Sequence, residues 1–582
     1  MENCKRMEAI EEQLQLPEPI IHHIQSSLSG KEAASTAVVS KSWYNSWLTR
    51  PILDFDERDF RNLNPYPRNN DRFFNYMNRS MERYHELNLK IESFKLWMYV
   101  RDIKSSSLAT ELIVKAVKMG VNKLNIEIHP PRATFILPKE VFGAESLKIL
   151  SVVGCKIDGI FGENVMCSRL ESLSLSDVSV GEDTMRDIIS GCPLIVNLFL
   201  SNCDGDLVKV NMSKMVKLEK LCVIRQLIKQ VVDWPGSFVE DERHDVVSVI
   251  DCLSNVREFH NLSYLVLDTV QIDSMLFHDF SNKFPCIEDL TVRKCYGCWR
   301  FNISSHSLKY ITLAHNEKLE AEFDVPNVLK FKFCGAITSS FSFTTASRGW
   351  ESDLTFACWG EFDVSWFEGL NNFLTHLSGS KISLNVVMPE EDQWDRCLLD
   401  FQDLPRPIVE NLTLELYYSL SVCSAFLDGI FRSIRPKFIT QRLFPIPHNK
   451  SQKANNKNPQ FERRKAEFDL VQLLCKQLMD IEHGNCSSTT GNMICWNELE
   501  GGHAESFEYT LMEWRPLPWK TLLDYLISPE KEARIRFRLR WGPPDSAGPY
   551  HGERTGLDGD MAPGGIRVYT RRRKRAEVAA KN

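Results

Sequence analysis

Residues 262–313 read LSYLVLDTVQIDSMLFHDFSNKFPCIEDLTVRKCYGCWRFNISSHSLKYITL and contain the pattern apolar-x-x-apolar-x-apolar three times. The copies begin at Leu262, Ile287 and Leu308, which places them 25 and 21 residues apart. Each copy predicts a short strand whose apolar side chains point inward. A single strand of this kind cannot bury those side chains without a neighbour on each side. The stretch therefore predicts an array of stacked units.

The same pattern occurs on both sides of this stretch. It reads Val121-Leu124-Ile126, Leu147-Leu150-Val152, Leu170-Leu173-Leu175, Ile195-Leu198-Leu200, Leu218-Leu221-Val223 and Val328-Phe331-Phe333. Successive starts are 20 to 26 residues apart, except for one step of 44, which we interpret as one repeat plus an insertion. These periods resemble those of leucine-rich-repeat proteins, whose units stack into a solenoid, or horseshoe. In that family an Asn or Cys follows three residues after the last apolar position, where Cys155, Cys203, Cys295 and Asn316 stand.

Beyond residue 340 the pattern weakens. Shorter units stand at Leu354-x-Phe356 and Leu384-x-Val386, and a full one at Val409-Leu412-Leu414, so we expect an irregular solenoid over 121–440. Residues 448–465 are basic and almost free of apolar side chains, which predicts a solvated linker. An α/β extension is expected over 466–541, with helices around Phe468–Leu478 and Trp519–Ile527 and a strand at Ile535–Trp541. The tail, 542–582, is rich in Gly, Pro and charge and is expected to be disordered.

A second informative stretch, LPEPIIHHIQSSLSGKEAASTAVVSKSWYNSW, spans Leu16 to Trp47. Leu16-Pro17 opens a helix, because a proline at the first helical position lacks an amide that would be unpaired there anyway. Helical spacing then predicts one apolar face from Ile20, Ile21, Ile24 and Leu28. Ser29-Gly30 ends that helix, and a second helical segment leads to Val38, Val39, Trp43 and Trp47. This order of residues closely resembles an F-box, which we place at 12–55, with a helical connector over 56–120.

The resemblance implies a plant-type F-box/leucine-rich-repeat protein, the substrate receptor of an SCF-type cullin-RING ubiquitin ligase. The F-box would bind a Skp-type adaptor and through it a cullin scaffold, and the repeats would hold a protein target. The adaptor-binding residues expected from the resemblance are Leu16, Pro17, Ile20, Ile24, Leu28, Val38 and Trp43. The alternative is a repeat-based binding scaffold without a ligase role, in which the N-terminal helices only cap the solenoid.

Composition and motifs set limits on other functions. The chain has 582 residues, a net charge of −7 and 17 cysteines, so we expect several domains, no general affinity for nucleic acid, and reduced thiols in cytoplasm or nucleus. No apolar run approaches 18 residues, which predicts no membrane span. Phosphate-binding loops, dinucleotide fingerprints and nucleophile elbows are absent from the sequence, so we expect no enzyme, no cofactor and no metal. His22 and His23 point in different directions on one helix and are expected at a surface or interface.

The target-binding surface is expected on the concave face, where side chains between the apolar positions point outward. We select Phe199, Tyr264, Arg293, Tyr310, Lys330 and Lys332 as candidates. Aromatic residues and arginine supply most binding hot spots, although single exposed aromatics also occur on ordinary surfaces. Cys295-Tyr-Gly-Cys298 has no second pair, so we interpret Cys295 as a structural thiol. The run Arg571–Arg575 is a nuclear import signal, a nucleic-acid contact or a solvated charged tail.

Overall fold

The computed structural model describes eighteen segments of the chain. These are residues 16–60, 71–129, 135–159, 167–203, 212, 215–225, 258–272, 274–297, 299–315, 318–347, 349–357, 364–388, 406–416, 420–443, 459–483, 499–508, 512–527 and 533–542. Several positions lie outside them: residues 543–582 of the expected tail, most of the insertion between two repeats, Asn316 and Cys298. Within these segments no helix is long and apolar enough to cross a membrane.

Three short helices form the N-terminal module: α2 (Glu18–Ser26), α3 (Gly30–Thr36) and α4 (Lys41–Thr49). Their boundaries follow from local capping. Ser29 and Glu32 form a reciprocal capping box at the start of α3, and the Ser40 side chain accepts from the Trp43 amide at the start of α4. The predicted break at Ser29-Gly30 is therefore confirmed.

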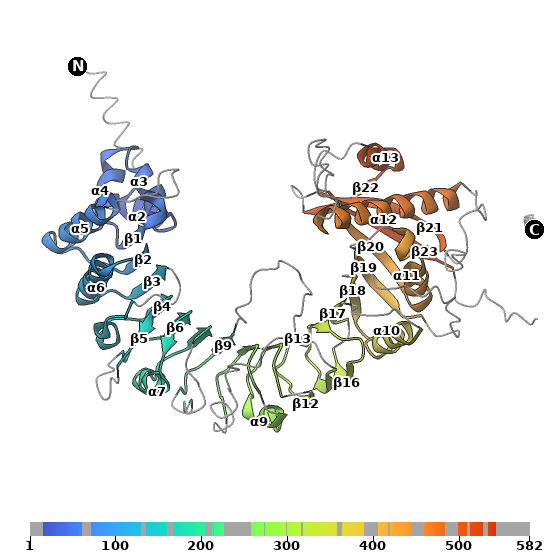
Figure 1. Ribbon diagram of the computed structural model, residues 1–582, viewed down its shortest axis with the longest axis horizontal. Helices are drawn as coiled ribbons and strands as arrows, with labels where there is room; N and C mark the ends of the chain where they lie inside the picture. The colour runs from blue at the N-terminus through green and yellow to red at the C-terminus, as the bar shows by residue number, and fades with distance from the viewer. Residues whose placement is uncertain are drawn as a thin grey trace, which may run out of the picture. The chain divides into compact units, whose positions relative to one another are not determined.

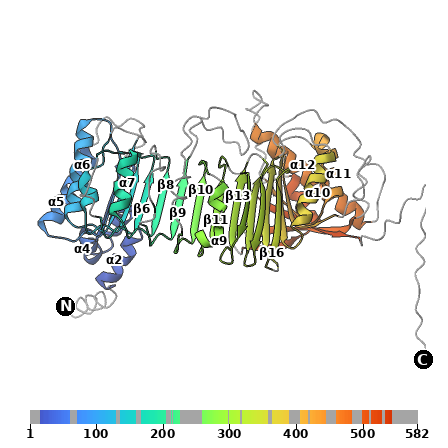
Figure 2. The ribbon, with the colours of Figure 1, turned by 90° about the horizontal axis from the view of Figure 1, so that it is seen from below.

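A parallel sheet runs through most of the chain, and each repeat contributes one strand to it (Figure 2). In spatial order these strands are β1 (Ile52–Asp56), β2 (Ser93–Tyr99), β3 (Lys123–His129), β4 (Ile149–Val153), β6 (Ser172–Ser176), β8 (Asn197–Ser201), β9 (Lys220–Ile224), β10 (Tyr264–Asp268), β11 (Asp289–Arg293), β13 (Tyr310–His315), β15 (Lys330–Gly335), β17 (Glu351–Ala357), β18 (Lys381–Met388), β19 (Ile408–Leu416) and β20 (Arg435–Leu443). All the predicted repeat strands are present.

The register of the strands explains the repeat pattern. Leu150, Leu173 and Leu198 are paired across neighbouring strands and are fully buried. The same row continues from Leu221 directly to Leu265, so β9 and β10 are neighbours in the sheet across the 44-residue step. The apolar consensus residues thus form one continuous core on the side of the sheet that faces the helices, which we call the inner side.

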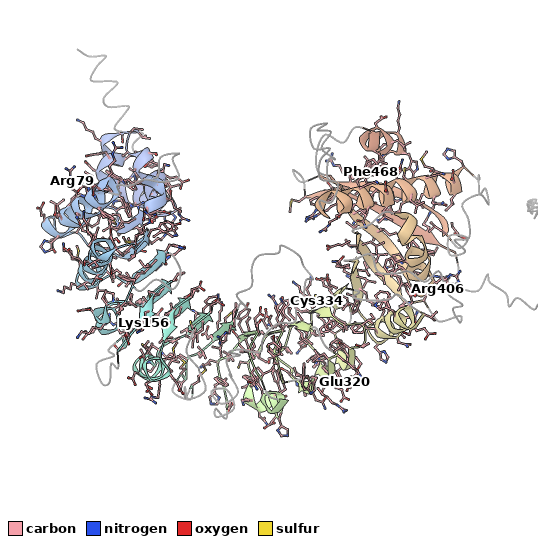
Figure 3. The ribbon with its side chains drawn as sticks, in the orientation of Figure 1. Arg79, Lys156, Glu320, Cys334, Arg406 and Phe468 are labelled. Atoms are coloured by element: carbon pink, nitrogen blue, oxygen red, sulfur yellow. The ribbon has the colours of Figure 1, made fainter. Side chains whose placement is uncertain are left out.

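The inner side of the sheet is covered by helices and short strands (Figure 1). They are η1 (Glu57–Phe60), α5 (Asp71–Glu86), α6 (Ile103–Lys118), η2 (Lys139–Gly143), β5 (Lys156–Ile157), β7 (Ser179–Val180), α7 (Glu182–Gly191), η5 (Ser274–Phe277), α9 (Phe280–Lys283), β12 (Arg300–Ser304), β14 (Glu320–Val325), β16 (Ser340–Ala346), α10 (Val364–His376) and α11 (Leu420–Ser433). Strands β12, β14 and β16 form a second parallel sheet. Figure 3 shows Cys334 of β15 on the helix-free side and Glu320 of β14 on the opposite side.

The C-terminal part adds an antiparallel extension to the sheet. It contains α12 (Pro459–Glu482), β21 (Leu499–Glu508), β22 (Glu513–Leu517), α13 (Trp519–Ile527) and β23 (Ala533–Trp541). Strand β23 pairs antiparallel with both β20 and β21, and β21 pairs with β22. The two helices and the strand expected here are confirmed.

Two expected segments differ from the structure. The connector is not purely helical, because Phe94, Leu96 and Met98 alternate with exposed or half-buried residues and form strand β2. Strand β1, at the end of the predicted F-box, pairs with β2, so the parallel sheet begins before the first predicted repeat. The predicted linker at 448–465 also overlaps α12, which begins at Pro459 and buries Ala466 and Leu470. The amphipathic pattern is clear only from Phe468 onward, so the predicted start of this helix was too late.

The cysteine positions in the turns behave as the repeat predicts. Cys155 and Cys295 are buried, and the Cys295 thiol lies 3.2 Å from the Arg293 carbonyl oxygen and 3.4 Å from that of Leu267. Burial raises the pKa of Cys155 to about 12, which makes that thiol a poor nucleophile. The interpretation of Cys295 as a structural thiol is consistent with these contacts.

Candidate functional site

Polar contacts around Gln25 connect the N-terminal helices. Its amide nitrogen donates to the Thr36 hydroxyl at 2.9 Å and to the Trp43 carbonyl oxygen at 3.2 Å. The His22 ring lies 3.1 Å from the Ser46 carbonyl oxygen and thereby links α2 to α4. Ile21 is fully buried, so it supplies an apolar anchor beside these contacts. His22 is therefore an interface residue of the module.

Many apolar side chains of this module remain exposed. We call them the F-box patch; its members are Leu16, Pro17, Ile20, Val38, Val39 and Tyr44. Ile20 is 46% exposed and Val38 is 89% exposed. Ile24, Leu28 and Trp43 are half-buried. The predicted single apolar face is thus split, because Ile21 points into the module while Ile20 points away from it.

The module is anchored to the beginning of the sheet. The Gly30 amide donates to the Asp54 carboxylate at 3.3 Å, and the buried Arg50 guanidinium donates to the Gln25 carbonyl oxygen at 3.4 Å. The Tyr84 hydroxyl of α5 donates to the Arg50 carbonyl oxygen at 2.6 Å. A Cβ at Gly30 would lie 2.7 Å from the Asp54 carbonyl oxygen, so only glycine allows this close approach.

The second candidate surface is the helix-free face of the sheet, which we call the open sheet face. Register places Tyr264, Asp289, Tyr310 and Lys330 side by side on four successive strands. Lys332 lies in the neighbouring row, which leads back along the sheet to Phe199. Tyr264 is 36% exposed and Tyr310 is 43% exposed. The structure therefore brings the predicted target-binding residues onto one face.

Lys330 and Lys332, both candidates for target binding, differ in their charged neighbours. Lys330 lies 2.7 Å from the Asp353 carboxylate and 3.6 Å from that of Glu351, and the Asp353 hydrogen bond raises the pKa of Lys330. Lys330 is thus already paired on the next strand, whereas Lys332 is exposed. Burial raises the pKa of Asp289, and the nearby positive charge of Lys332 opposes this shift. The two lysines, selected together from the sequence, therefore have different electrostatic surroundings.

The residues that the structure describes form no metal-binding cluster. No group of three His, Cys, Asp or Glu side chains among them could hold a metal ion. Arg293 lies 4.0 Å from Asp268, but this is an exposed ion pair on the sheet. The arrangement of both surfaces is suited to binding through side-chain contact.

Comparisons with known proteins agree with this arrangement. Residues 13–55 match the F-box domain family, and residues 110–236 match a family described as FBD-associated F-box protein At5g56370, LRR repeats. The chain combines an F-box domain with leucine-rich repeats. The matched F-box segment contains all three N-terminal helices and most of β1.

Three curated proteins of Arabidopsis thaliana illustrate the similarity. FBD-associated F-box protein At5g53635 is 26% identical over 247 residues, which cover 42% of this chain and 54% of the relative. F-box/LRR-repeat protein At3g18150 is 28% identical over 218 residues, 37% of this chain and 43% of the relative. F-box/LRR-repeat protein At3g59200 is 29% identical over 194 residues, 32% and 36% respectively. The matches span about half of the relatives' length or less.

Sequence reasoning missed two members of the F-box patch, Val39 and Tyr44. Both are exposed, and Tyr44 packs at a ring distance of 6.1 Å from Trp47. The adjacent pair Val38-Val39 could have indicated exposure, because two neighbouring residues of a helix or turn point in different directions and cannot both face a small core. It also missed Asp353 and Glu351, which neutralise Lys330 and are recognised only once the strand register is known.

Proposed function

We propose that this F-box/leucine-rich-repeat chain is a substrate-recognition subunit of an SCF-type ubiquitin ligase. The F-box patch binds a Skp-type adaptor, and the open sheet face binds a protein target. The observation that carries the proposal is the exposure of apolar side chains on the patch, where Ile20 and Val38 lie in solvent. Exposed apolar clusters of this kind usually mark protein interfaces.

In this role the chain contributes no chemical step of its own. It holds a target near the ubiquitin-loaded enzyme, which raises the effective concentration of the target's lysines. The anchoring of the F-box through Arg50 and Tyr84 supports such a role, because it couples the adaptor contact to the repeats. We place this assembly in the cytoplasm or nucleus.

The target contact is centred on the aromatic residues of the open sheet face. Tyr264 and Tyr310 flank Asp289, and large amphipathic rings of this kind supply contact area at small entropic cost. Lys332 provides an accessible positive charge beside them, whereas Lys330 is held by acidic residues of β17. A target segment with an apolar anchor next to an acidic residue fits this surface.

The adaptor contact is tested by replacing Leu16 and Pro17 together with alanine in the full chain. Both side chains are exposed, so the repeats should remain folded while adaptor affinity falls by about tenfold or more. Affinity is measured by biolayer interferometry against a purified Skp-type adaptor, and folding by circular dichroism. Unchanged affinity with a folded chain would reject the F-box role and favour a repeat scaffold without ligase function.

The target contact is tested by Tyr264→Ala combined with Tyr310→Ala. Target capture in cells, followed by mass spectrometry, should be lost while the adaptor still co-purifies. Ile103→Ala provides a control, because Ile103 is an exposed apolar residue on α6, away from both surfaces. Capture that survives the tyrosine pair but is lost on deletion of residues 229–249 would assign recognition to the insertion between β9 and β10.

A further inference from the structure

A row of arginines occupies one side of the C-terminal sheet. Strand β23 reads ARIRFRLRW, and its side chains alternate between the two faces. Ile535, Phe537 and Leu539 are buried on the inner face. The outer face carries arginines from β23 and one from β20, and we call it the arginine face: Arg442, Arg534, Arg536, Arg538 and Arg540.

The inner face is the one that packs against helices. A Cβ at Gly502 of β21 would lie 3.0 Å from the Leu478 side chain of α12, and Phe537 stacks with Trp519 of α13. The arginines of β23 alternate with these buried positions, so they lie on the opposite face of that strand. Arg442 of β20 lies close to α12: burial raises the pKa of Glu467 on that helix, and the nearby charge of Arg442 opposes this shift. Arg442, Arg538 and Arg540 are exposed. The arginine face is therefore accessible in the described part of the chain.

A single carboxylate, that of Glu505 on β21, is shared among several cations here. It is 2.5 Å from the Arg536 guanidinium, 3.8 Å from that of Arg538 and 3.1 Å from the His503 ring. One negative charge cannot neutralise two arginines, and Arg540 adds another positive charge beside them, whereas Arg442 has the carboxylate of Glu467 nearby. The face keeps a positive excess although the whole chain carries a net charge of −7.

Arginine guanidinium groups already cover the rings of Phe438 and Trp514 on this face. The Arg536 guanidinium lies 4.5 Å from the centre of the Phe438 ring and 4.4 Å from that of Trp514, so it is held between them. Arg538 also lies over Phe438, at 5.1 Å, yet 49% of its side chain is exposed. Glu505 and the rings thus fix Arg536, and Arg538 is oriented beside it with its guanidinium accessible.

We propose that the arginine face binds an extended acidic segment of a protein partner. Alternate residues on a strand are about 6.6–6.8 Å apart, and acidic residues at alternate positions of an extended peptide have the same spacing. Guanidinium groups bind carboxylates with paired hydrogen bonds, which suits Arg538 and Arg540 as primary contacts. The surface is separate from the F-box patch, so it does not depend on adaptor binding.

Two observations favour a peptide over nucleic acid. Binding of single strands relies on bases stacking on free aromatic rings, but Arg536 covers Phe438 and Trp514. Nucleic-acid-binding domains are also usually basic as a whole, whereas the calculated isoelectric point of this chain is about 6.1. A local positive face on an acidic chain is better matched to a short acidic segment.

The test measures fluorescence anisotropy of a labelled peptide of twelve residues, about half of them glutamates at alternate positions with threonine between, added to the full chain. Arg538→Glu with Arg540→Glu should weaken binding by about tenfold or more, because two attractions become repulsions. The matched control, Arg300→Glu with Lys318→Glu, changes the net charge equally at two exposed cations on and before the second sheet. It should change affinity by less than about twofold at physiological salt, where distant charges are screened.

A gain-of-function variant separates binding from folding. Glu505→Gln removes the internal carboxylate that competes for Arg536 and Arg538, so affinity for the peptide should rise by about two- to fivefold. A structural role alone would predict no gain. Arg538→Lys with Arg540→Lys keeps the charge but loses the paired geometry, and it should weaken binding by about two- to fourfold.

If the arginine face binds something other than an acidic peptide, these measurements give different results. Equal losses from the arginine pair and its control would overturn the proposal, because the attraction would then be general. Oligothymidylate of matched charge that binds more tightly than the peptide, and is lost in the arginine variant, would assign the face to nucleic acid. Salt-dependent dimers in sedimentation that the same variant abolishes would identify a second copy of this chain as the partner.

Discussion

Replacing Ile20 and Val38 with alanine together should weaken adaptor binding without destabilising the chain. Val38 is 89% exposed and Ile20 is 46% exposed, so their contribution in the free chain is small. Truncation removes two carbons from valine and three from isoleucine, each worth about 0.8 kcal/mol when fully buried. Scaling by exposure gives about 1.4 kcal/mol for Val38 and about 1.1 kcal/mol for Ile20 if the adaptor covers both. The sum, about 2.5 kcal/mol, corresponds to roughly a sixtyfold rise in Kd.

The assay is isothermal titration of the purified full chain with a Skp-type adaptor, alongside thermal unfolding of the free chain. Ile103→Ala is the matched control, because Ile103 is 86% exposed but lies on α6 outside the F-box patch. Ile21→Ala is the opposite case: its side chain is fully buried, so it should destabilise the module by about 2–5 kcal/mol. A Kd within threefold of the parent for the Ile20 and Val38 pair would refute our use of exposure to locate the interface.

Three further outcomes concern stability. Gly30→Ala should lower the free energy of unfolding by about 1–3 kcal/mol in a urea titration, because the added Cβ meets a backbone oxygen of β1; an unchanged midpoint would contradict that close approach. Lys330→Met should cost about 0.5–1 kcal/mol by the same titration since its acidic partners lose their cation, whereas Lys332→Met should change stability by less than about 0.5 kcal/mol; equal effects would contradict the observed pairing. Burial acts to raise the pKa of Glu505, but hydrogen bonds, chiefly from Arg536, outweigh it and lower that pKa, so its stabilising contribution is present above the ordinary carboxylate pKa and is lost as pH falls through the lowered value. Glu505→Gln should flatten the acid limb of a plot of Tm against pH, and an unaltered limb would argue against this linkage.

The repeat strands were predictable because residues at the same consensus position of successive repeats are buried and are paired with one another in the sheet. Leu173 and Leu198 are 25 residues apart in the sequence and directly paired in the sheet. Strand β1 was missed because Leu53 and Phe55 alternate without the longer consensus, whereas β2 was missed although Ile91, Phe94 and Leu96 have the consensus spacing. The second sheet was missed for a similar reason, because β12, β14 and β16 lie between consensus units.

The candidate surfaces were only partly predictable. An apolar residue in a helix looks the same in sequence whether it fills a core or remains exposed, so Ile20 and Ile21 could not be separated. The arginine face could not be found because Phe438 and Arg538 are 100 residues apart in the sequence and meet only through the antiparallel pairing of β20 with β23. Charge pairing across strands, as at Lys330, likewise depends on register.

The continuous row of paired strands also fixes the distance along the sheet between the F-box and the tyrosines of the open sheet face. Seven inter-strand steps lead from β1, where the F-box is anchored, to β10 with Tyr264, and two more lead to β13 with Tyr310. At about 4.8 Å a step, these contacts lie roughly 34 and 43 Å from β1 when followed along the sheet. In the proposed receptor role, gain or loss of one repeat before β10 would shift a captured target by a single step relative to the adaptor. Repeat number would thereby select which lysines of that target come within range of the transferred ubiquitin.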